Sequence, residues 1–288
     1  MKPPFRLPAR AHDSHKGDYG RVLIVAGSKR MPGAATLAAL GALRGGAGLV
    51  TVATPECALP LIAPACPCAL FEPLPAAEDG FLARSALAPL RAAAAKADVV
   101  VLGPGLGAQA AVSSLLRAFC VSLPKPLVLD ADGLNAFAAE PDAIARRSFP
   151  TILTPHPGEL ARLDGHAPTA DARSRRACAQ DAAKRFRAVV CLKGAGTVVA
   201  GVAGDRRTYV NRTGNPGMAT GGSGDVLSGL LGALLARIED PFQAAALAVF
   251  THGRAGDFAK RRRGETALIA SDLVEHLGDA LRTVERAR

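Results

Sequence analysis

The chain has 288 residues, 49% of them hydrophobic and 4% aromatic, with 35 lysines and arginines against 25 acidic residues. This composition excludes an intrinsically disordered chain, and because no linker-like stretch divides it we expect one domain over residues 1–288. The net charge of +10 favours anionic partners. The first 20 residues are polar. No apolar stretch reaches the ~20 residues of a membrane span, so we expect a cytoplasmic protein without a membrane partner.

Nucleic acid would be one class of anionic partner for so basic a chain. Proteins that bind single strands interleave basic residues with aromatic side chains that stack on bases. The one dense basic run here is Lys260–Arg263, and only Phe258 lies nearby. We therefore interpret the run as a solvated loop between two C-terminal helices and expect no nucleic-acid partner.

Six cysteines stand in apolar sequence surroundings. In a cytoplasmic chain such a pattern predicts buried, reduced thiols. Cys66-Pro-Cys68 has no second pair of Cys or His at zinc spacing, so it is not a candidate zinc site. The sequence leaves the ligands of any metal ion unknown.

Short apolar runs alternate with alanine-rich segments along the chain. The first unit is a strand at Val22–Val25 and a helix at Gly33–Leu43 that ends at two glycines. Further strands are predicted at residues 50–53, 99–102, 127–129, 152–153, 189–192, 197–202 and 208–210, and C-terminal helices near residues 225–237, 242–260 and 271–284. Continuous apolar strands form parallel sheets covered on both faces. We therefore predict an α/β fold with a mostly parallel central sheet and helices on both faces.

Polar, glycine-containing loops follow most of these strands, and in such sheets the carboxyl ends of the strands bind ligands. Gly103–Gly107, Gly-Pro-Gly-Leu-Gly, is either a ligand loop or a simple tight turn. Asp130 and Asp132, with Asn135 after them, are candidates to bind ribose hydroxyls or a magnesium-bound water. Capping of the following helix is the alternative. At the N-terminus, His15–Gly20 either reaches a substrate or only ties down the chain end.

His156 lies between Pro155 and Pro157 at the end of a predicted strand. The two prolines restrict the backbone and hold the imidazole there, which favours a hydrogen-bonding or proton-handling role over a packed core histidine. Glu159 is a candidate either for magnesium or for capping the helix that follows.

Residues 193–197 follow directly after another apolar strand. Lys193, Gly194, Ala195, Gly196 and Thr197 offer a cation, two flexible glycines and a hydroxyl, which are suited to a phosphate or nucleotide. A hairpin turn between antiparallel strands is the alternative. The ammonium group directly after the strand favours the nucleotide.

Residues 215–225, Asn-Pro-Gly-Met-Ala-Thr-Gly-Gly-Ser-Gly-Asp, precede a long apolar run and carry the strongest signal in the chain. A helix predicted to begin at about Gly224 would direct free N–H groups and its positive dipole end toward an anion. Gly222, Ser223 and Gly224 are therefore the candidate anion hole. No Gly-Lys-Ser/Thr follows a glycine at the spacing of a P-loop, so this is a different phosphate site.

Asp225 is the unexpected residue at this helix start. Its carboxylate would repel a bound phosphate, so we interpret it as a proton acceptor for a hydroxyl that attacks a phosphoryl group. The alternative is a capping or first-turn acid that only stabilises the helix.

Taken together, the motifs resemble those of the ADP-dependent NAD(P)H-hydrate dehydratase family, a branch of the ribokinase-like fold. The match covers nearly the whole chain in the family's order, without a departure at these positions. It rests on His15–Gly20, residues 26–28 with 32–35, Gly103–Gly107, residues 130–135, residues 154–159, residues 193–197 and residues 221–225. Some members carry an additional N-terminal epimerase domain, and this chain resembles the stand-alone dehydratase.

The resemblance implies a repair reaction on the S epimer of hydrated NADH or NADPH. ADP, with Mg²⁺ as cofactor, would phosphorylate the ring hydroxyl, and loss of phosphate would regenerate NAD(P)H and leave AMP. Asp225 would be the base, and a cytoplasmic homotetramer is the expected assembly. Lys193, Gly194, Ala195, Gly196, Thr197 and Gly224 would surround the adenine nucleotide, and Ala35, Gly105, His156 and Asp225 the hydrated nicotinamide.

Two other functions compete with this one. A ribokinase-like kinase of a vitamin precursor or other small molecule would use the same anion hole and base but release a stable phosphate ester. A nucleotide sensor without catalysis, or a nucleic-acid-binding protein, is the other class. The carboxylate of Asp225 argues against a pure nucleotide binder, since it weakens the binding of phosphate.

Overall fold

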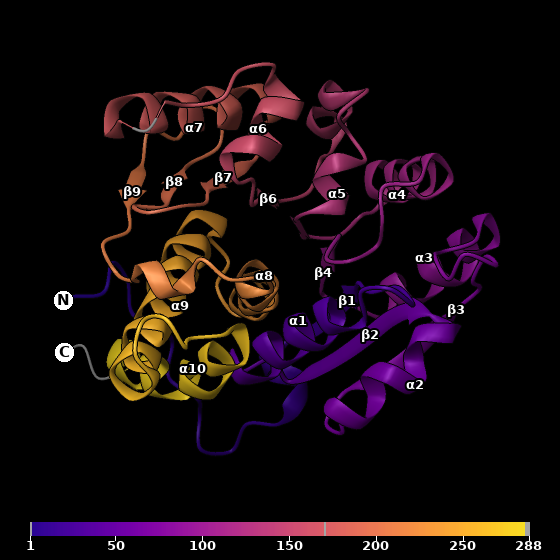
Figure 1. Ribbon diagram of the computed structural model, residues 1–288, viewed down its shortest axis with the longest axis horizontal. Helices are drawn as coiled ribbons and strands as arrows, with labels where there is room; N and C mark the ends of the chain where they lie inside the picture. The colour runs from indigo at the N-terminus through magenta and orange to yellow at the C-terminus, as the bar shows by residue number, and fades with distance from the viewer. Residues whose placement is uncertain (1, 170, 286–288) are drawn as a thin grey trace.

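The computed structural model describes residues 2–169 and 171–285. Within these residues nine strands form one sheet in the order β3-β2-β1-β4-β5-β6-β7-β8-β9 (Figure 1). The first seven are parallel, and β8 and β9 are antiparallel to their neighbours. The strands are β1 (Arg21–Val25), β2 (Leu49–Pro55), β3 (Leu70–Leu74), β4 (Val99–Leu102), β5 (Leu127–Leu129), β6 (Thr151–Leu153), β7 (Val189–Leu192), β8 (Val198–Ala200) and β9 (Thr208–Val210).

Helices cover both faces of the sheet, as predicted. Figure 1 shows α6 and α7 on one side of β6 to β9 and α8 and α9 on the other. None of the described helices has both the length and the apolar character that a membrane span requires. The helices are α1 (Pro32–Arg44), α2 (Leu59–Ile62), α3 (Leu87–Ala95), α4 (Ala110–Ser122), α5 (Asp132–Asn135), α6 (Pro157–Asp164), α7 (Ala172–Phe186), α8 (Ser223–Leu235), α9 (Pro241–Arg263) and α10 (Ala270–Glu285).

The sheet separates two hydrophobic cores, and alternate residues of one strand enter each. Val22 and Ile24 of β1 pack into the core beneath α1, α8, α9 and α10, whereas Leu23 and Val25 pack into the core beneath α3 to α7. Successive side chains of a strand point to opposite faces. The fully apolar sequence of β1 is therefore what a strand buried on both faces requires.

Strand β3 was not predicted from the sequence. Its residues Leu-Phe-Glu-Pro-Leu include a charge and a proline, and most of them are partly exposed. Among the described strands it pairs only with β2, at the edge of the sheet. An edge strand tolerates proline and charge because one of its sides lacks a hydrogen-bonding neighbour.

The basic run Lys260–Arg263 is the last turn of α9 and not the predicted loop. Cations at a helix C-terminus interact favourably with the helix dipole, which explains why the helix continues through them. Lys260 pairs with Glu265 at 2.9 Å, and Arg263 pairs with Asp272 at 3.0 Å.

The prediction of buried thiols is wrong for three cysteines. Cys57, in the 3₁₀ helix before α2, and Cys68, in a turn after α2, are exposed, and Cys178 on α7 is only partly buried.

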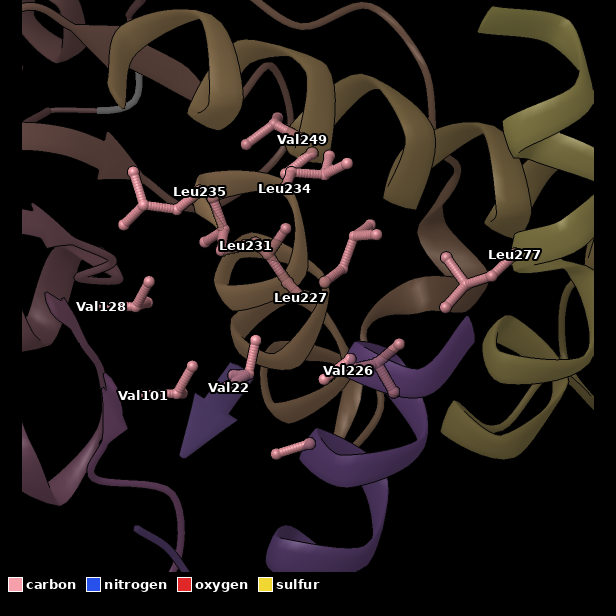
Figure 2. Packing of buried hydrophobic residues seen from close by; sticks show 14 of the residues in the cluster. Val22, Val101, Val128, Val226, Leu227, Leu231, Leu234, Leu235, Val249 and Leu277 are labelled. Atoms are coloured by element: carbon pink, nitrogen blue, oxygen red, sulfur yellow. The ribbon is translucent and has the colours of Figure 1, made fainter. Parts of the chain in front are cut away.

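Helix α8 passes through the centre of the first core. Every residue from Val226 to Leu235 is buried, and a helix that is apolar on all sides requires neighbours on all sides. Figure 2 shows Val22 and Val101 of the sheet on one side of α8 and Val249 of α9 on the other. A Cβ on Gly229 would lie 1.8 Å from the carbonyl oxygen of Ala38, so glycine permits the close approach of α1 and α8.

Gly229→Ala is expected to lower the free energy of unfolding by about 2 to 3 kcal/mol, because the new methyl group meets the backbone of α1. Urea unfolding measures this change. Gly278→Ala on α10 is the control, because a Cβ there meets no atom within 4 Å. The control is expected to raise stability by up to about 1 kcal/mol through helix propensity. Equal effects of the two substitutions would contradict the proposed close packing.

Candidate functional site

The predicted site residues from the loops after β4 to β7 lie at the carboxyl edge of the sheet, where α8 also begins. The loop after β4 is joined to the next by a hydrogen bond of 2.7 Å from the Gly107 N–H to Asp132. The backbone N–H of Lys193 donates to the carbonyl of Pro155 at 2.8 Å and links the loops after β6 and β7. Parallel strands bring these loops together although they are far apart in the sequence.

The first turn of α8 provides the candidate anion hole. The helix begins at Ser223, after Gly222 in the left-handed conformation with φ of 89°. A Cβ on Gly222 would lie 2.4 Å from Cδ1 of Leu37, so this turn requires glycine. The Ser223 hydroxyl donates to the Met218 carbonyl at 2.9 Å and is not free for a ligand. Backbone N–H groups of the first helical turn have no intrahelical acceptor. The Ser223 N–H makes a long contact of 3.4 Å with the Thr220 carbonyl, and the Gly224 N–H is placed to face an anion.

Asp130 is the most connected polar residue of the site. Its carboxylate is 1% exposed and accepts hydrogen bonds from Lys193 at 2.7 Å, Thr154 at 2.7 Å and Ser228 at 2.6 Å. Burial by itself raises the pKa of Asp130, but the charge of Lys193 and the three hydrogen bonds outweigh it and hold the pKa below its usual value. Within the described residues these three donors account for the contacts of the Asp130 carboxylate. That Asp130 binds ribose hydroxyls or a magnesium-bound water, or caps a helix, stays a prediction.

The Lys193 side chain points into the protein. Its ammonium group lies 2.7 Å from Asp130 and 3.6 Å from Glu159. Burial alone lowers the pKa of Lys193, but these two carboxylates outweigh it and raise the pKa above its ordinary value. A Cβ built on Gly224 would be 3.5 Å from this ammonium group. Lys193 therefore supplies a fixed positive charge beneath the anion hole.

The rest of this loop, Gly194 to Gly196, is exposed, and Thr197 donates to the Gly194 carbonyl at 3.0 Å. Because β7 and β8 are antiparallel, residues 193–197 form the hairpin turn that was the alternative to a nucleotide loop. Arg175 of α7 supports the turn from below, donating to the Lys193 carbonyl at 3.0 Å. Hairpin geometry and ligand contact are compatible, since the tip of the turn faces outward.

Asp225 stands in the first turn of α8 beside this arrangement. Its pKa is raised to about 7, first by burial and then by the negative charge of Asp130, while Lys193 acts in the opposite direction. The described residues form no side-chain cap at this helix start. A carboxylate that stabilised the helix through its negative charge would lie where the ionised form is favoured, whereas the surroundings of Asp225 favour the protonated form. The site therefore contains an acid that exchanges its proton near neutral pH, which suits a general base.

His156 is the N-cap of α6. Its Nδ1 accepts hydrogen bonds from the N–H groups of Gly158 at 3.0 Å and Glu159 at 3.2 Å, so the neutral ring carries its proton on Nε2. Glu159 completes a capping box by accepting the His156 N–H at 2.7 Å. The side chain is 48% exposed, so His156 is not a core residue. The hydrogen-bonding role expected for it exists, but its described partners belong to α6: two backbone N–H groups at Nδ1, and the Glu159 carboxylate 3.5 Å from Nε2.

Two of the candidates for the hydrated nicotinamide lie near the start of α1. Ala35 is fully buried in the core, and a Cβ on Gly27 would lie 2.8 Å from its methyl group. The Ala35 side chain is therefore covered by the loop after β1 and is not accessible to a ligand. Gly105 packs against the same helix start, where a Cβ on it would be 2.8 Å from that of Ala34.

Asp132 and Asn135 serve the loops themselves. Beyond its bond to Gly107, Asp132 accepts a hydrogen bond of 3.3 Å from the Asn135 amide. The N-terminal segment His15–Tyr19 precedes β1 and so lies at the amino edge of the sheet, opposite the site. Its Asp18 accepts the His15 N–H at 2.9 Å, and it ties down the chain end.

Three residues of the site were missed in the sequence. Thr154 lies within a recognised motif, and Ser228 follows Asp225 by three positions, one helical turn, so both could have been found. His252 on α9 gave no signal. Its Nε2 lies 2.9 Å from the Ser223 carbonyl, and burial lowers its pKa to about 4. A neutral His252 therefore donates to the first turn of α8 from behind and fixes its position.

The described residues hold no group of three or more His, Cys, Asp or Glu side chains that could bind a metal ion. Asp130 is occupied by its donors, and Glu159 by the His156 N–H and Lys193. Mg²⁺ commonly binds through one or two carboxylates together with the phosphates of a substrate. The residues present do not fit a metal site made by the protein alone.

A family model for NAD(P)H-hydrate dehydratases matches residues 22–278 of this chain. The bifunctional NAD(P)H-hydrate repair enzyme of Moorella thermoacetica is 44% identical over 280 residues, which are 97% of this chain and 52% of that protein. The chain thus spans about half the length of the bifunctional relatives it matches. The ADP-dependent (S)-NAD(P)H-hydrate dehydratase of Bacillus subtilis is 38% identical over 280 residues, 94% of this chain and 92% of that protein.

Solved structures agree with the sequence matches. The ADP/ATP-dependent NAD(P)H-hydrate dehydratase of Bacillus subtilis, co-crystallised with ATP and Mg²⁺, has a TM-score of 0.79 and 32% identity, covering 99% of this chain and 100% of that one. Arabidopsis thaliana ribokinase has a TM-score of 0.53 at 14% identity, covering 90% of this chain and 98% of that one, and shows the fold alone. The expected ribokinase-like fold and the family resemblance are both confirmed.

The cap formed by His156 can be tested by stability. His156→Ala is expected to lower the free energy of unfolding by about 1 kcal/mol, because the N–H groups of Gly158 and Glu159 lose their acceptor. His156→Asn keeps an acceptor at the N-cap and is expected to stay within about 0.5 kcal/mol of the wild type. Urea unfolding of both variants measures the difference. If the two lose equal stability, the ring matters through packing and not as a cap.

Proposed function

We propose that this chain, which belongs to the NAD(P)H-hydrate dehydratase family, dehydrates the S epimer of hydrated NADH and NADPH with ADP as the phosphoryl donor. The observation that carries the proposal is Asp225, an acid with a pKa of about 7 in the first turn of α8, beside the buried ammonium of Lys193. A base, a fixed cation and free helix N–H groups together serve phosphoryl transfer to a hydroxyl.

The reaction begins at the hydroxyl group of the hydrated ring. Asp225 accepts the hydroxyl proton as the oxygen forms a bond to the β-phosphorus of ADP, and the bond between that phosphorus and the AMP oxygen breaks. In the second step the ring carbon–oxygen bond breaks, a proton leaves the neighbouring carbon, and phosphate departs with the former hydroxyl oxygen. The products are NAD(P)H, AMP, phosphate and a proton.

The chain's own groups stabilise the charge that moves in the first step. The N–H groups of Gly222, Ser223 and Gly224 form the anion hole, with that of Gly224 pointing to the phosphoryl group, and Lys193 lies beneath them. Helix-end amides are fixed before the reaction and need no reorganisation. His252 supports the arrangement by holding the Ser223 carbonyl.

The two substrates take different parts of the site. The adenine nucleotide lies along Lys193, Gly194, Ala195, Gly196 and Thr197, with Gly224 at its phosphates. The hydrated nicotinamide lies toward Gly105 and His156, with its hydroxyl at Asp225. His156 meets the nicotinamide through the exposed part of its side chain, which is 48% accessible. The contact with Ala35 is through the backbone, because its side chain is buried.

In this proposal Mg²⁺ would be held through the nucleotide phosphates, since the described part of the chain offers no cluster of ligands for it, and it would neutralise phosphate charge. We further propose that residues 1–288 form one domain and that the protein works in the cytoplasm as a homotetramer. A vitamin-precursor kinase, the competing function, would leave a stable phosphate ester among its products.

Incubating the protein with hydrated NADH, Mg²⁺ and either ADP or ATP tests the function directly. We expect the absorbance of NADH to return, with AMP and phosphate appearing in equal amounts when ADP is supplied. Accumulation of a phosphate ester of another small molecule, without recovery of NADH, would support the kinase instead. Recovery of NADH with no nucleotide present would contradict the phosphoryl-transfer mechanism.

Asp225→Asn is expected to lower turnover at least ~100-fold while nucleotide binding is retained, because the variant lacks the base for the hydroxyl proton. Glu239→Gln is the control, an exposed carboxylate four residues beyond the end of α8. The helix itself rises about 15 Å from Asp225 to Leu235. Its turnover is expected to equal that of the wild type. Turnover of Asp225→Asn within tenfold of the wild type would make Asp225 a first-turn acid without a catalytic role.

Introducing a negative charge tests whether the loop at residues 193–197 contacts the nucleotide. Ala195→Glu introduces a negative charge at an exposed position of the turn and is expected to weaken ADP binding at least ~5-fold, or ~1 kcal/mol of repulsion. Ala92→Glu on α3 makes the same change of net charge at an exposed position outside the site. Titration calorimetry measures the ADP affinity of the wild type and of both variants. Equal ADP affinity in both variants would remove the loop from the nucleotide site.

A further inference from the structure

The buried carboxylate of Asp130 does more than neutralise Lys193. Its three donors come from three elements: Thr154 after β6, Lys193 after β7, and Ser228 within α8. Ser228 stands one turn after Gly224, whose carbonyl lies 3.1 Å from its hydroxyl. Asp130 therefore connects the strand ends directly to the helix that carries Asp225.

The two carboxylates also lie close enough to interact through charge. A Cβ on Gly224 would be 3.9 Å from Oδ2 of Asp130, and one on Gly222 would be 3.9 Å from Oδ2 of Asp225. Asp130 thus lies beside Gly224, the residue before Asp225, and its donor Ser228 stands three positions after Asp225, on the same side of α8. With Asp130 nearly inaccessible to solvent, little water screens its charge.

Other charged groups face Asp225 from the surrounding elements. Asp132 of α5 and Glu159 of α6 add to its proton affinity, and Lys193 reduces it. His252 of α9, whose pKa is lowered to about 4, is neutral at pH 7. Burial contributes most to the raised pKa of Asp225, and the negative charge of Asp130 contributes more than that of any other neighbouring carboxylate.

We propose that Asp130 is a positioning residue that keeps Asp225 able to accept a proton near neutral pH, by its fixed negative charge and by neutralising Lys193, the cation beside the start of α8. The catalytic meaning of this inference rests on the proposed function, whereas the coupling of the two carboxylates does not. A general base is most effective when its proton affinity matches the working pH.

The direction of the effect follows from both contributions. Asp130→Asn removes a negative charge beside Asp225 and leaves the positive charge of Lys193 without its closest counter-ion. Each change lowers the pKa of Asp225 from its wild-type value of about 7. The pKa of Asp225 is higher in the folded protein than in the unfolded chain, where it is about 4. Between about pH 4 and 7 the ionisation of Asp225 in the unfolded chain therefore lowers the free energy of unfolding as pH rises. Asp130→Asn brings the two pKa values closer and makes this decrease in stability smaller.

The test measures the protonation of Asp225 without any substrate. Carboxyl carbons of aspartate are labelled with ¹³C, their NMR signals are followed against pH, and Asp225→Asn identifies the signal of Asp225. We expect a midpoint near 7 in the wild type. In Asp130→Asn the proton affinity of Asp225 is expected to fall at least ~10-fold. An unchanged proton affinity would overturn the proposal.

Ser228→Ala is the matched control, because it removes one hydrogen bond to Asp130 and keeps the charge. It is expected to leave the proton affinity of Asp225 within about twofold, well below the tenfold effect of one pKa unit. A fall as large as that in Asp130→Asn would show that hydrogen bonding, not charge, sets the affinity. Asp130→Ser is a second variant that removes the charge of Asp130, and it is titrated in the same way as Asp130→Asn. Both titrations are done in sucrose, which stabilises the folded protein.

A pH profile of turnover connects the coupling to catalysis. The acid limb of kcat/KM for hydrated NADH is expected to move to lower pH in Asp130→Asn by the same factor as the NMR midpoint. If the NMR midpoint moves but no hydrate is turned over, the coupling stands and the proposed function fails. If hydrate is turned over but neither midpoint nor limb moves, the proposed function stands and the role of Asp130 fails.

Discussion

The ion pair between Lys193 and Asp130 is the interaction on which the site depends. Its atoms lie 2.7 Å apart, with side chains 18% and 1% exposed. Breaking a buried pair of this kind costs several kcal/mol, because the remaining charge is left without compensation. The pair joins the ends of β5 and β7, and through Ser228 it also holds α8. The geometry of the anion hole and the charge around Asp225 therefore follow from one buried contact.

Helix α8 belongs both to the core and to the site. Its residues from Val226 to Leu235 are buried between the sheet, α1 and α9, and its first turn faces the ligands. Close packing prevents the helix from shifting without disturbing the core. Gly229 and the donor His252 set its position from two sides. A rigid helix keeps its N–H groups in place, which is what stabilisation of a phosphoryl group requires.

The sequence predicted most elements because their patterns are local. Runs such as Val99–Leu102 are apolar over their whole length, as buried parallel strands must be, and the glycines of residues 215–225 mark a phosphate-binding helix start. Strand β3 escaped prediction because its proline and charge are acceptable only at an edge, and the position of a strand in the sheet is not local. Lys260–Arg263 was predicted as a loop although cations suit the last turn of a helix, and its pair with Asp272 of α10 became visible only in the structure.

What the sequence determined by itself is the set of chemical groups at the site: an aspartate at a glycine-rich helix start, a lysine after a strand and a histidine between two prolines. Tertiary structure decided which way they face and in what state of protonation. Lys193 could have reached outward to a ligand, yet its side chain points inward to Asp130. The Nδ1 of His156 accepts the backbone N–H groups at the start of α6. Proton affinity depends on burial and on charges that are distant in the chain, so the pKa of Asp225 appears only when β5, β7 and α8 meet.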